Sequence, residues 1–436
     1  MTIWKPEPKI IRQTLPNQPI ILYRGFTELI DRENIIEGKS WVQISWYPYP
    51  TITVKFVYKS EEDINLKDVE LKLTELIPQA RMSVHLSKYI HYCGSKKTEL
   101  FGYLTKPFRQ GITDNLSSVT FHITNFFWFN ISNIFDYEYD QNGNEIEIQR
   151  EGWLMFDGQF IFDYDNWHFV LATLDENGEL EEKLEAQGGY GVTHICKLER
   201  SDEQAFNLDE ANKMIDAFVY YLSFVRGIWV SPLLIYGWDA EGNKILEEWS
   251  TPKIKADSWQ SLSYCWTTSD TTEMVIIFPK FMKKWEDENW KETIQNAIQW
   301  YVESYKHSNG YNTSIILIQS ALEKLAWTYL KTNQCVNSED FNGLKASGQI
   351  RLLLKFLNIP LEPVDKYLEI NKKAKELNWM DSIKAITEIR NAIIHPPSKN
   401  NKNNKITSEQ ILTEVFQISH YYLQQCLLKI FEYPYI

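Results

Sequence analysis

The sequence predicts an α+β protein with more than one domain, in which a β-rich antiparallel region precedes an all-α region. Three observations lead to this fold class. Apolar residues alternate with polar ones in many short runs up to about residue 185, which is typical of strands. From Phe281 onward the apolar spacing changes to that of helices. With 436 residues, the chain is long enough for two or three domains with cores of their own.

Residues 1–185 are predicted to form an antiparallel sandwich or barrel. Apolar residues alternate with polar ones most clearly at 69–73, 82–86 and 119–123. Asp, Asn and Gly residues that favour tight turns lie between such runs. Repeated hairpins with many aromatic residues are typical of sandwiches and barrels.

Residues 186–275 are predicted either to complete this β-rich domain or to form a small α+β module. Asn207 followed by Glu210 resembles a capping box, and the apolar run 211–225 behind it predicts a buried helix. Two strands joined by a turn are expected between residues 229 and 249. Both arrangements agree with this pattern.

Residues 276–436 are predicted to form a helical bundle. Helices are expected at 285–307, 315–330, 349–357, 364–377, from about 381 to 395, and at 408–431. Helices of these lengths with short connections favour a bundle.

The formal net charge of −13 is unevenly distributed. Residues 281–436 carry 19 Lys and Arg against 17 Asp and Glu, a net charge of +2, which leaves 26 against 41, or −15, for residues 1–280. The overall charge argues against a protein that coats nucleic acid non-specifically. The acidic region either merely keeps the protein soluble, or it repels RNA or covers the site until a signal arrives.

The cysteines and the hydropathy give expectations about cofactors and compartment. Five scattered cysteines without C-x-x-C spacing indicate neither a disulfide framework nor a zinc site, and no metal or other cofactor is predicted. No apolar run approaches the roughly eighteen residues of a membrane span, and the first residues lack an apolar signal core. We therefore expect a cytoplasmic protein that has no membrane partner.

The stretch from Ile389 to Pro397 is the predicted functional centre. A helix that begins near Asp381 places its isoleucines on one face, and Arg390 and His395 lie off that face. The two prolines after His395 should end the helix there, where the negative end of the helix dipole favours a cationic imidazole. About 140° of rotation separates Arg390 from His395, so they can flank one groove. An arginine for phosphate oxygens and a histidine that titrates near neutrality suit metal-free phosphodiester chemistry.

Arg390-Asn391, three apolar residues and His395 resemble the R-x4-6-H signature of the HEPN superfamily. The predicted helix 315–330 carries Ser320-Ala321-Leu322-Glu323-Lys324-Leu325, which resembles the first HEPN helix with its acidic position. The larger arrangement is similar to the Apea-type HEPN proteins of bacterial antiphage defence. The resemblance implies an HEPN-like bundle that cleaves RNA without metal, in a composite site at a dimer interface.

The resemblance also implies roles for these residues. The ribose 2′-OH would attack the adjacent phosphorus in line, with His395 as general base or acid and Arg390 stabilising charge on the phosphoryl oxygens. Asn391 would orient the histidine or bond a phosphate oxygen, unless it is only a surface amide. Glu323 would hold Arg390 by a bidentate pair, unless it is an ordinary surface glutamate. Three lysines would grip the RNA backbone or belong to a solvated loop: Lys399, Lys402 and Lys405.

The predicted function is that of a metal-independent endoribonuclease that acts in antiphage defence by abortive infection, on tRNA or other RNA. One Arg/His pair per chain predicts a homodimer. The N-terminal region would sense an activator or restrain the nuclease, and the activator would be a phage-derived or host molecule. The alternative is a non-catalytic binding or assembly module with a β-rich domain that binds a ligand or a protein.

Overall fold

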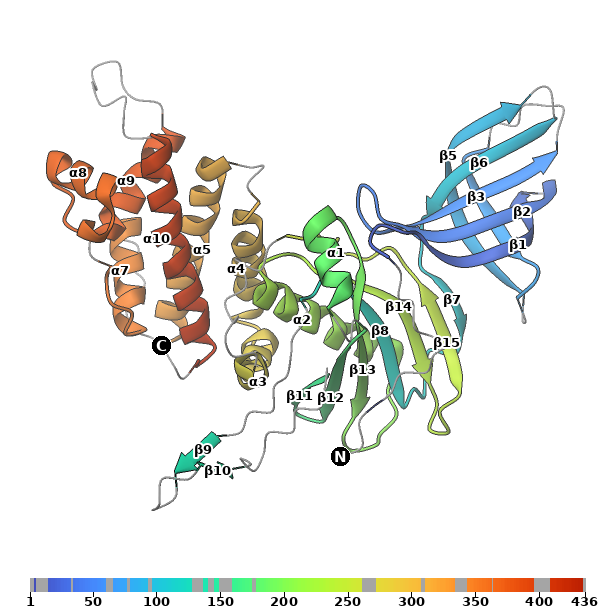
Figure 1. Ribbon diagram of the computed structural model, residues 1–436, viewed down its shortest axis with the longest axis horizontal. Helices are drawn as coiled ribbons and strands as arrows, with labels where there is room; N and C mark the ends of the chain where they lie inside the picture. The colour runs from blue at the N-terminus through green and yellow to red at the C-terminus, as the bar shows by residue number, and fades with distance from the viewer. Residues whose placement is uncertain are drawn as a thin grey trace. The chain divides into compact units, whose positions relative to one another are not determined.

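The computed structural model describes Trp4 and residues 15–127, 136–139, 145–148, 159–260 and 272–433, except for residues 33, 60–65, 77–78, 93–95, 175–177, 307–309, 334–342, 363 and 396–407. The fold is α+β, with antiparallel strands up to residue 249 and helices after it (Figure 1). The chain divides into two compact units, Met1–Val219 with Trp229–Leu262, and Tyr220–Ile228 with Ser263–Ile436. The predicted succession of a β-rich region and a helical region is confirmed.

The first strands form a closed antiparallel barrel in the order β1-β2-β3-β6-β5-β4. They are β1 (Ile20–Asp31), β2 (Asn34–Ser45), β3 (Thr51–Lys59), β4 (Asp68–Leu73), β5 (Ala80–Tyr92) and β6 (Lys97–Leu104). Burial alternates along them; β3, for example, buries Ile52, Val54, Phe56 and Tyr58 and turns the residues between them outward. The predicted runs 69–73 and 82–86 lie in β4 and β5 with their apolar side chains buried.

A second antiparallel sheet follows, in the order β11-β12-β13-β8-β14-β15-β7. Its strands are β7 (Phe108–Gly111), β8 (Ser118–Thr124), β11 (Gln159–Tyr164), β12 (Trp167–Thr173), β13 (Val192–Arg200), β14 (Pro232–Trp238) and β15 (Lys244–Trp249), and the helices between them are α1 (Glu179–Gln187) and α2 (Leu208–Arg226). Strands β9 (Asp136–Tyr139) and β10 (Glu145–Ile148) pair separately. Strands from both sides of residue 185 thus share one sheet, and its core is continuous with that of the barrel.

Helix α2 begins with the predicted capping box. The backbone N–H of Asn207 donates to Glu210 Oε2 at 2.9 Å, and the backbone N–H of Glu210 donates to Asn207 Oδ1 at 2.9 Å. These reciprocal bonds satisfy two backbone donors that no helical carbonyl can reach. The apolar run behind them is buried along the helix, as predicted.

The helical unit contains α3 (Thr272–Glu286), α4 (Lys291–Ser304), α5 (Gly310–Thr332), α7 (Ala346–Phe356), the 3₁₀ turn η4 (Val364–Lys366), α8 (Leu368–Leu377), α9 (Ser382–Ile394) and α10 (Glu409–Ile430). Helix α5 packs against α4, α7, α9 and α10, so it is the central helix of the unit (Figure 1). None of the helices in the described part of the chain is long and apolar enough to cross a membrane.

The prediction of one helix over residues 285–307 was wrong. Helix α3 ends at Glu286 and α4 begins at Lys291. Between them Asp287 closes a turn: its side chain accepts from the Asn289 N–H at 2.9 Å, and its carbonyl accepts from the Trp290 N–H at 2.9 Å. An aspartate that binds nearby backbone donors competes with the helix, which explains the break.

Candidate functional site

Helix α9 positions the predicted catalytic residues, and its bounds follow from local chemistry. The Asp381 side chain accepts from the Lys384 N–H at 2.7 Å, which caps the first turn. Ile383, Ile386 and Ile389 are fully buried, as the apolar spacing predicted. The helix ends at Ile394, followed by an extended residue, His395, with φ −102° and ψ 115°. The predicted helix and its end at the histidine are confirmed.

Asn391 accepts a side-chain hydrogen bond from Arg390 and the backbone hydrogen bond that ends α9 at His395. Arg390 Nη1 donates to Asn391 Oδ1 at 3.4 Å, and the backbone N–H of His395 donates to the Asn391 carbonyl at 2.8 Å. Asn391 and His395 are exposed, whereas Arg390 is half-buried. The Arg390 Nε is buried and has no hydrogen-bond partner among the described residues. The end of α9 therefore presents an exposed imidazole on the same helix as an arginine with unused hydrogen-bonding capacity.

Glu323 does not hold Arg390. It is half-buried on α5, and its Oε1 accepts from Gln319 Nε2 at 2.7 Å. Glu323 and Arg390, both in the described part of the chain, form no ion pair with each other, although α5 and α9 pack together. The three predicted RNA-binding lysines, Lys399, Lys402 and Lys405, lie outside the described residues.

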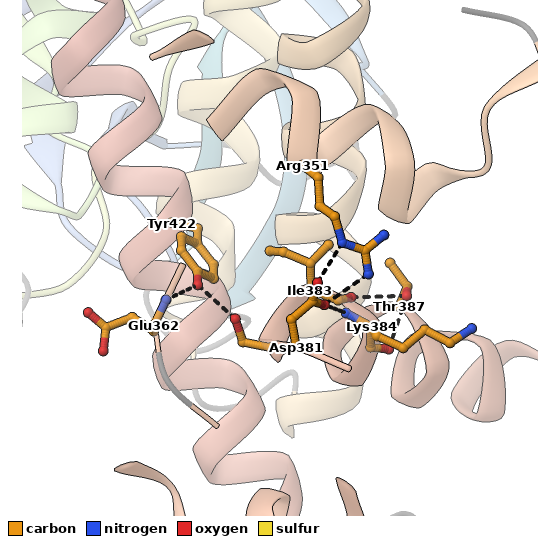
Figure 2. Close-up of polar contacts among 8 residues, drawn as sticks. Arg351, Glu362, Asp381, Ile383, Lys384, Thr387 and Tyr422 are labelled. Atoms are coloured by element: carbon orange, nitrogen blue, oxygen red, sulfur yellow. Dashed lines mark hydrogen bonds and ion pairs between the residues drawn. The ribbon is translucent and has the colours of Figure 1, made fainter. Parts of the chain in front are cut away.

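A second polar cluster lies at the other end of α9, and it was not predicted (Figure 2). Arg351 on α7 donates to Asp381 through Nε at 2.6 Å and through Nη2 at 2.9 Å. The buried Tyr422 hydroxyl on α10 lies 2.8 Å from Ser382 Oγ and accepts from the Glu362 N–H at 2.6 Å. These bonds tie α9 to α7, to α10 and to the segment before α8.

Two pKa shifts reflect this cluster. Burial of Asp381 would raise its pKa, but the hydrogen bonds from Arg351 and the Lys384 N–H outweigh burial and lower the pKa. Burial raises the pKa of Tyr422 to about 12. Asp381 is thus held ionised, and Tyr422 is held neutral.

A pocket of about 750 Å³ adjoins this cluster. Its lining combines carboxylates, one lysine, amides and apolar side chains: Leu361, Glu362, Asp365, Asn371, Ala374, Lys375, Asn378, Trp379, Met380 and Asp381. Met380, one of these lining residues, is 79% exposed. Lys366 and Arg351 pair with Glu362 and Asp381, so the pocket is less acidic than its carboxylates suggest. No group of three or more His, Cys, Asp or Glu in the described residues could hold a metal ion.

Sequence reasoning missed this second cluster because its partners are far apart in the chain. Arg351 and Asp381 are 30 positions apart, and Ser382 and Tyr422 are 40 apart. The one local signal was Asp381 itself, a residue type that favours the position before a helix. That Arg351 also binds Asp381 could not be deduced from that signal.

The comparisons with known proteins correct the family assignment. Residues 287–435, which carry the proposed HEPN resemblance, match the family model of the YopA C-terminal domain, and residues 111–261 match that of the YopA central domain. The HEPN assignment was therefore wrong. No solved structure matches the chain.

A similar protein is the SPbeta prophage-derived uncharacterized protein YopA of Bacillus subtilis (strain 168). The two are 22% identical over 410 residues, which cover 91% of this chain and 86% of the relative. The central match lies over the second sheet with α1 and α2, and the C-terminal match runs from before α4 to the end of α10. The chain thus resembles YopA in both its sheet-bearing middle part and its helical part.

Proposed function

We propose that the helical unit is a metal-independent endoribonuclease whose site is the C-terminal end of α9. The observation that carries the proposal is the arrangement of Arg390, Asn391 and His395 around one helix end. Among described residues the Arg390 guanidinium has no carboxylate partner, Asn391 accepts a hydrogen bond from its Nη1, and His395 is exposed at the end of the same helix. The planar guanidinium of arginine can donate two hydrogen bonds to phosphate oxygens, and histidine is suited to proton transfer near neutral pH.

The chemistry follows from these groups and from the substrate. The ribose 2′-oxygen attacks the adjacent phosphorus and loses its proton to His395, and the bond from phosphorus to the 5′-oxygen breaks. Arg390 stabilises the charge that develops on the phosphoryl oxygens. The leaving 5′-oxygen takes up a proton, so the products are a 2′,3′-cyclic phosphate and a 5′-hydroxyl. The nucleophile belongs to RNA, so DNA is not a substrate.

A homodimer would complete the site, because one chain supplies one Arg390/His395 pair. Within the dimer one histidine would act as base and the other as acid. The beginning of α9 gives the helix a fixed position, since it is tied to α7 and α10. Catalytic groups on a well-anchored helix keep their geometry better than groups on a loop.

The test is incubation of the purified protein with total RNA in EDTA, followed by analysis of the product ends. We expect fragments that end in 2′,3′-cyclic phosphate, lost in both Arg390→Ala and His395→Ala. Lys384→Ala is the matched control, because it removes a cation from the same helix that pairs only with Glu388 in the described part. Cleavage that persists in both variants, or no cleavage by a dimeric wild type with RNA from uninfected and infected cells, would refute the proposal.

The proposed biological role is growth arrest of infected bacteria through cleavage of tRNA or other RNA in the cytoplasm. The relative in Bacillus subtilis is prophage-derived, which supports a role in conflict between phage and host. The N-terminal unit would sense a phage-derived or host activator, or restrain the site. Expression of the wild type should slow growth, whereas His395→Ala should not.

The pocket beside Asp381 favours a second candidate function, that of a non-catalytic module that binds a small polar ligand. Its carboxylates and amides could bind polar groups of a ligand, and Trp379 could contact an apolar part of it. The Arg390 and His395 variants would then leave the protein's cellular effect unchanged, whereas Trp379→Ala would abolish it.

A further inference from the structure

The outer face of the barrel carries a row in which cations and aromatic rings alternate across five strands. Arg24 on β1 pairs in register with Trp41 on β2, and Trp41 with Lys55 on β3. Lys55 pairs with Phe101 on β6, and Phe101 with Lys88 on β5. These strands lie side by side in the closed barrel (Figure 1). We call these five residues the cation–aromatic row.

Alternation along β2, β3 and β6 turns Trp41, Lys55 and Phe101 outward, and the register shift between Leu86 and Lys88 leaves Lys88 on the exposed side of β5. The residues next to Trp41, Lys55 and Phe101 in their strands are buried: Ser40, Val42, Val54, Phe56, Leu100 and Gly102. Arg24 and Lys88 are exposed at its ends, and Trp41 and Phe101 are half-buried between them. Side chains opposite one another on neighbouring strands are in reach of each other. The row is therefore a continuous surface feature.

Each ring has a cation close to it on both sides. Arg24 lies 5.7 Å from the centre of the Trp41 ring, and Lys55 lies 5.9 Å from it. Lys55 lies 5.5 Å from the centre of the Phe101 ring, and Lys88 lies 5.9 Å from it. Such distances permit cation–π attraction, which holds the rings and cations together as one unit.

A further pair extends the row along β1 and β2. Lys39 lies 4.7 Å from the centre of the Phe26 ring, and the two residues are opposite each other in the register. Phe26 is 58% exposed, so this ring is open to solvent. The surface is thus wider than a single line of residues.

Positive charge on this surface is largely unused. In the described part of the chain Arg24, Lys39 and Lys88 form no ion pair, and all three are exposed. Lys55 pairs with the buried Glu99 at 2.9 Å. Elsewhere on the barrel, Lys72 and Arg81 are neutralised by Glu28 and Glu70. Arg24, Lys39 and Lys88 therefore leave unpaired positive charge beside the rings, although residues 1–280 carry a net charge of −15 (26 Lys and Arg against 41 Asp and Glu).

We propose that the cation–aromatic row binds single-stranded RNA, with bases stacked on Trp41 and Phe101 and phosphates held by Arg24, Lys39 and Lys88. Rings interleaved with cations are the surface that unpaired bases and a phosphate backbone require. The two rings are two strands apart, or roughly 10 Å, so each can take its own base. A duplex keeps its bases stacked inside and does not fit. The choice of RNA over DNA rests on the proposed ribonuclease function.

The test is the fluorescence anisotropy of labelled oligo(U) of about twelve nucleotides, bound by the full-length chain with His395→Ala in EDTA, so that cleavage does not interfere. Loss of both rings in Trp41→Ala/Phe101→Ala should weaken binding at least about 30-fold. Replacement of the three exposed cations by glutamine should lower the slope of log affinity against log salt by about 2. Since those three side chains are exposed, this second variant keeps the fold. Trp327→Ala, an exposed tryptophan with Lys331 4.4 Å from its ring in α5, is the matched control and should bind like the parent.

Several results would overturn the proposal. They are no binding of oligo(U), equal binding by the row variants, tighter binding of oligo(dT), or equal binding of duplex RNA. The first of these would leave a protein partner as the occupant of the row. Because binding is measured in the His395→Ala background, the two proposals fail separately. Row-dependent binding without cleavage by the wild type refutes only the nuclease, and cleavage without row-dependent binding refutes only this surface.

Discussion

Asp381→Ala should loosen α9 more than any other single change at the helix ends, because Asp381 has two functions. It caps the helix through the Lys384 N–H at 2.7 Å, and it accepts two hydrogen bonds from Arg351 at 2.6 and 2.9 Å. The side chains of Asp381 and Arg351 are only 16% and 27% exposed. Solvent therefore screens this pair less than the exposed pairs of the same unit.

The magnitude follows from the two contributions. Loss of an N-cap costs about 1 kcal/mol, and loss of hydrogen bonds between charged groups costs about 1.5–3 kcal/mol. We expect Asp381→Ala to lower the free energy of opening α9 by about 3 kcal/mol and Arg351→Ala to lower it by about 2 kcal/mol. The double variant should resemble Asp381→Ala alone, because the shared pair is lost only once.

The assay is amide hydrogen exchange measured by mass spectrometry, since it reports on α9 separately from the rest of the chain. A loss of about 3 kcal/mol corresponds to exchange on the order of 100-fold faster in α9. Lys384→Ala is the control, because it removes only the ion pair with Glu388 on the surface of the same helix. It should change the free energy of opening α9 by less than about 0.5 kcal/mol. Unchanged exchange in Asp381→Ala, or effects of the two single variants that simply add, would refute the assignment.

The stabilisation of α9 by the Asp381–Arg351 pair should depend on pH. The pKa of Asp381 is lowered in the folded protein, so the unfolded chain binds its proton at a higher pH than the folded one does. The stabilisation is therefore complete above the ordinary aspartate pKa and is lost as the pH falls through the lowered value. The difference in α9 exchange between wild type and Asp381→Ala should shrink accordingly in acid.

Two further changes test other parts of the fold. Burial lowers the pKa of His420 to about 3, so between pH 3 and the ordinary pKa of 6.5 this histidine is protonated only in the unfolded chain. The free energy of unfolding should therefore fall by about 1.4 kcal/mol per pH unit as the pH is lowered through this window. His420→Phe should flatten that pH dependence in urea titrations. Gly189 has φ +92°, and a Cβ there would lie 1.9 Å from Asn17 Oδ1, whereas Gly242, with φ +80°, has nothing within 4 Å. Gly189→Ala should therefore lower the thermal midpoint further than Gly242→Ala, and equal shifts would contradict the role of the clash.

Local patterns in the sequence predicted several local interactions correctly, although the turn at Asp287 that divides α3 from α4 was missed. The alternation in 69–73 and 82–86 predicted two barrel strands, and Asn207 with Glu210 predicted a capping box. The isoleucines of α9 predicted its buried face. Helix α1 was missed because only Leu180 and Leu184 are buried among nine mostly polar residues, too few to give a clear helical period.

The candidate surfaces were not predictable in the same way, because strand register and helix packing determine them. Trp41 and Phe101 are 60 positions apart, and only the pairing of β2 with β3 and of β3 with β6 places Lys55 between them. The HEPN resemblance failed for a related reason. An arginine and a histidine at a helix end form a short pattern that unrelated helices can share, and the partner expected for Arg390, Glu323, contacts Gln319.

The two ends of α9 differ in a way that separates stability from function. At the beginning of the helix the charged groups of Asp381 and Arg351 satisfy each other, so this end supplies rigidity. At the other end the buried Arg390 Nε has no hydrogen-bond partner among the described residues, which costs stability, and His395 is exposed. Substitutions of Asp381 or Arg351 should therefore speed amide hydrogen exchange along the whole of α9. Substitutions of His395 should change chemistry without changing exchange, and this contrast distinguishes a functional group from a structural one.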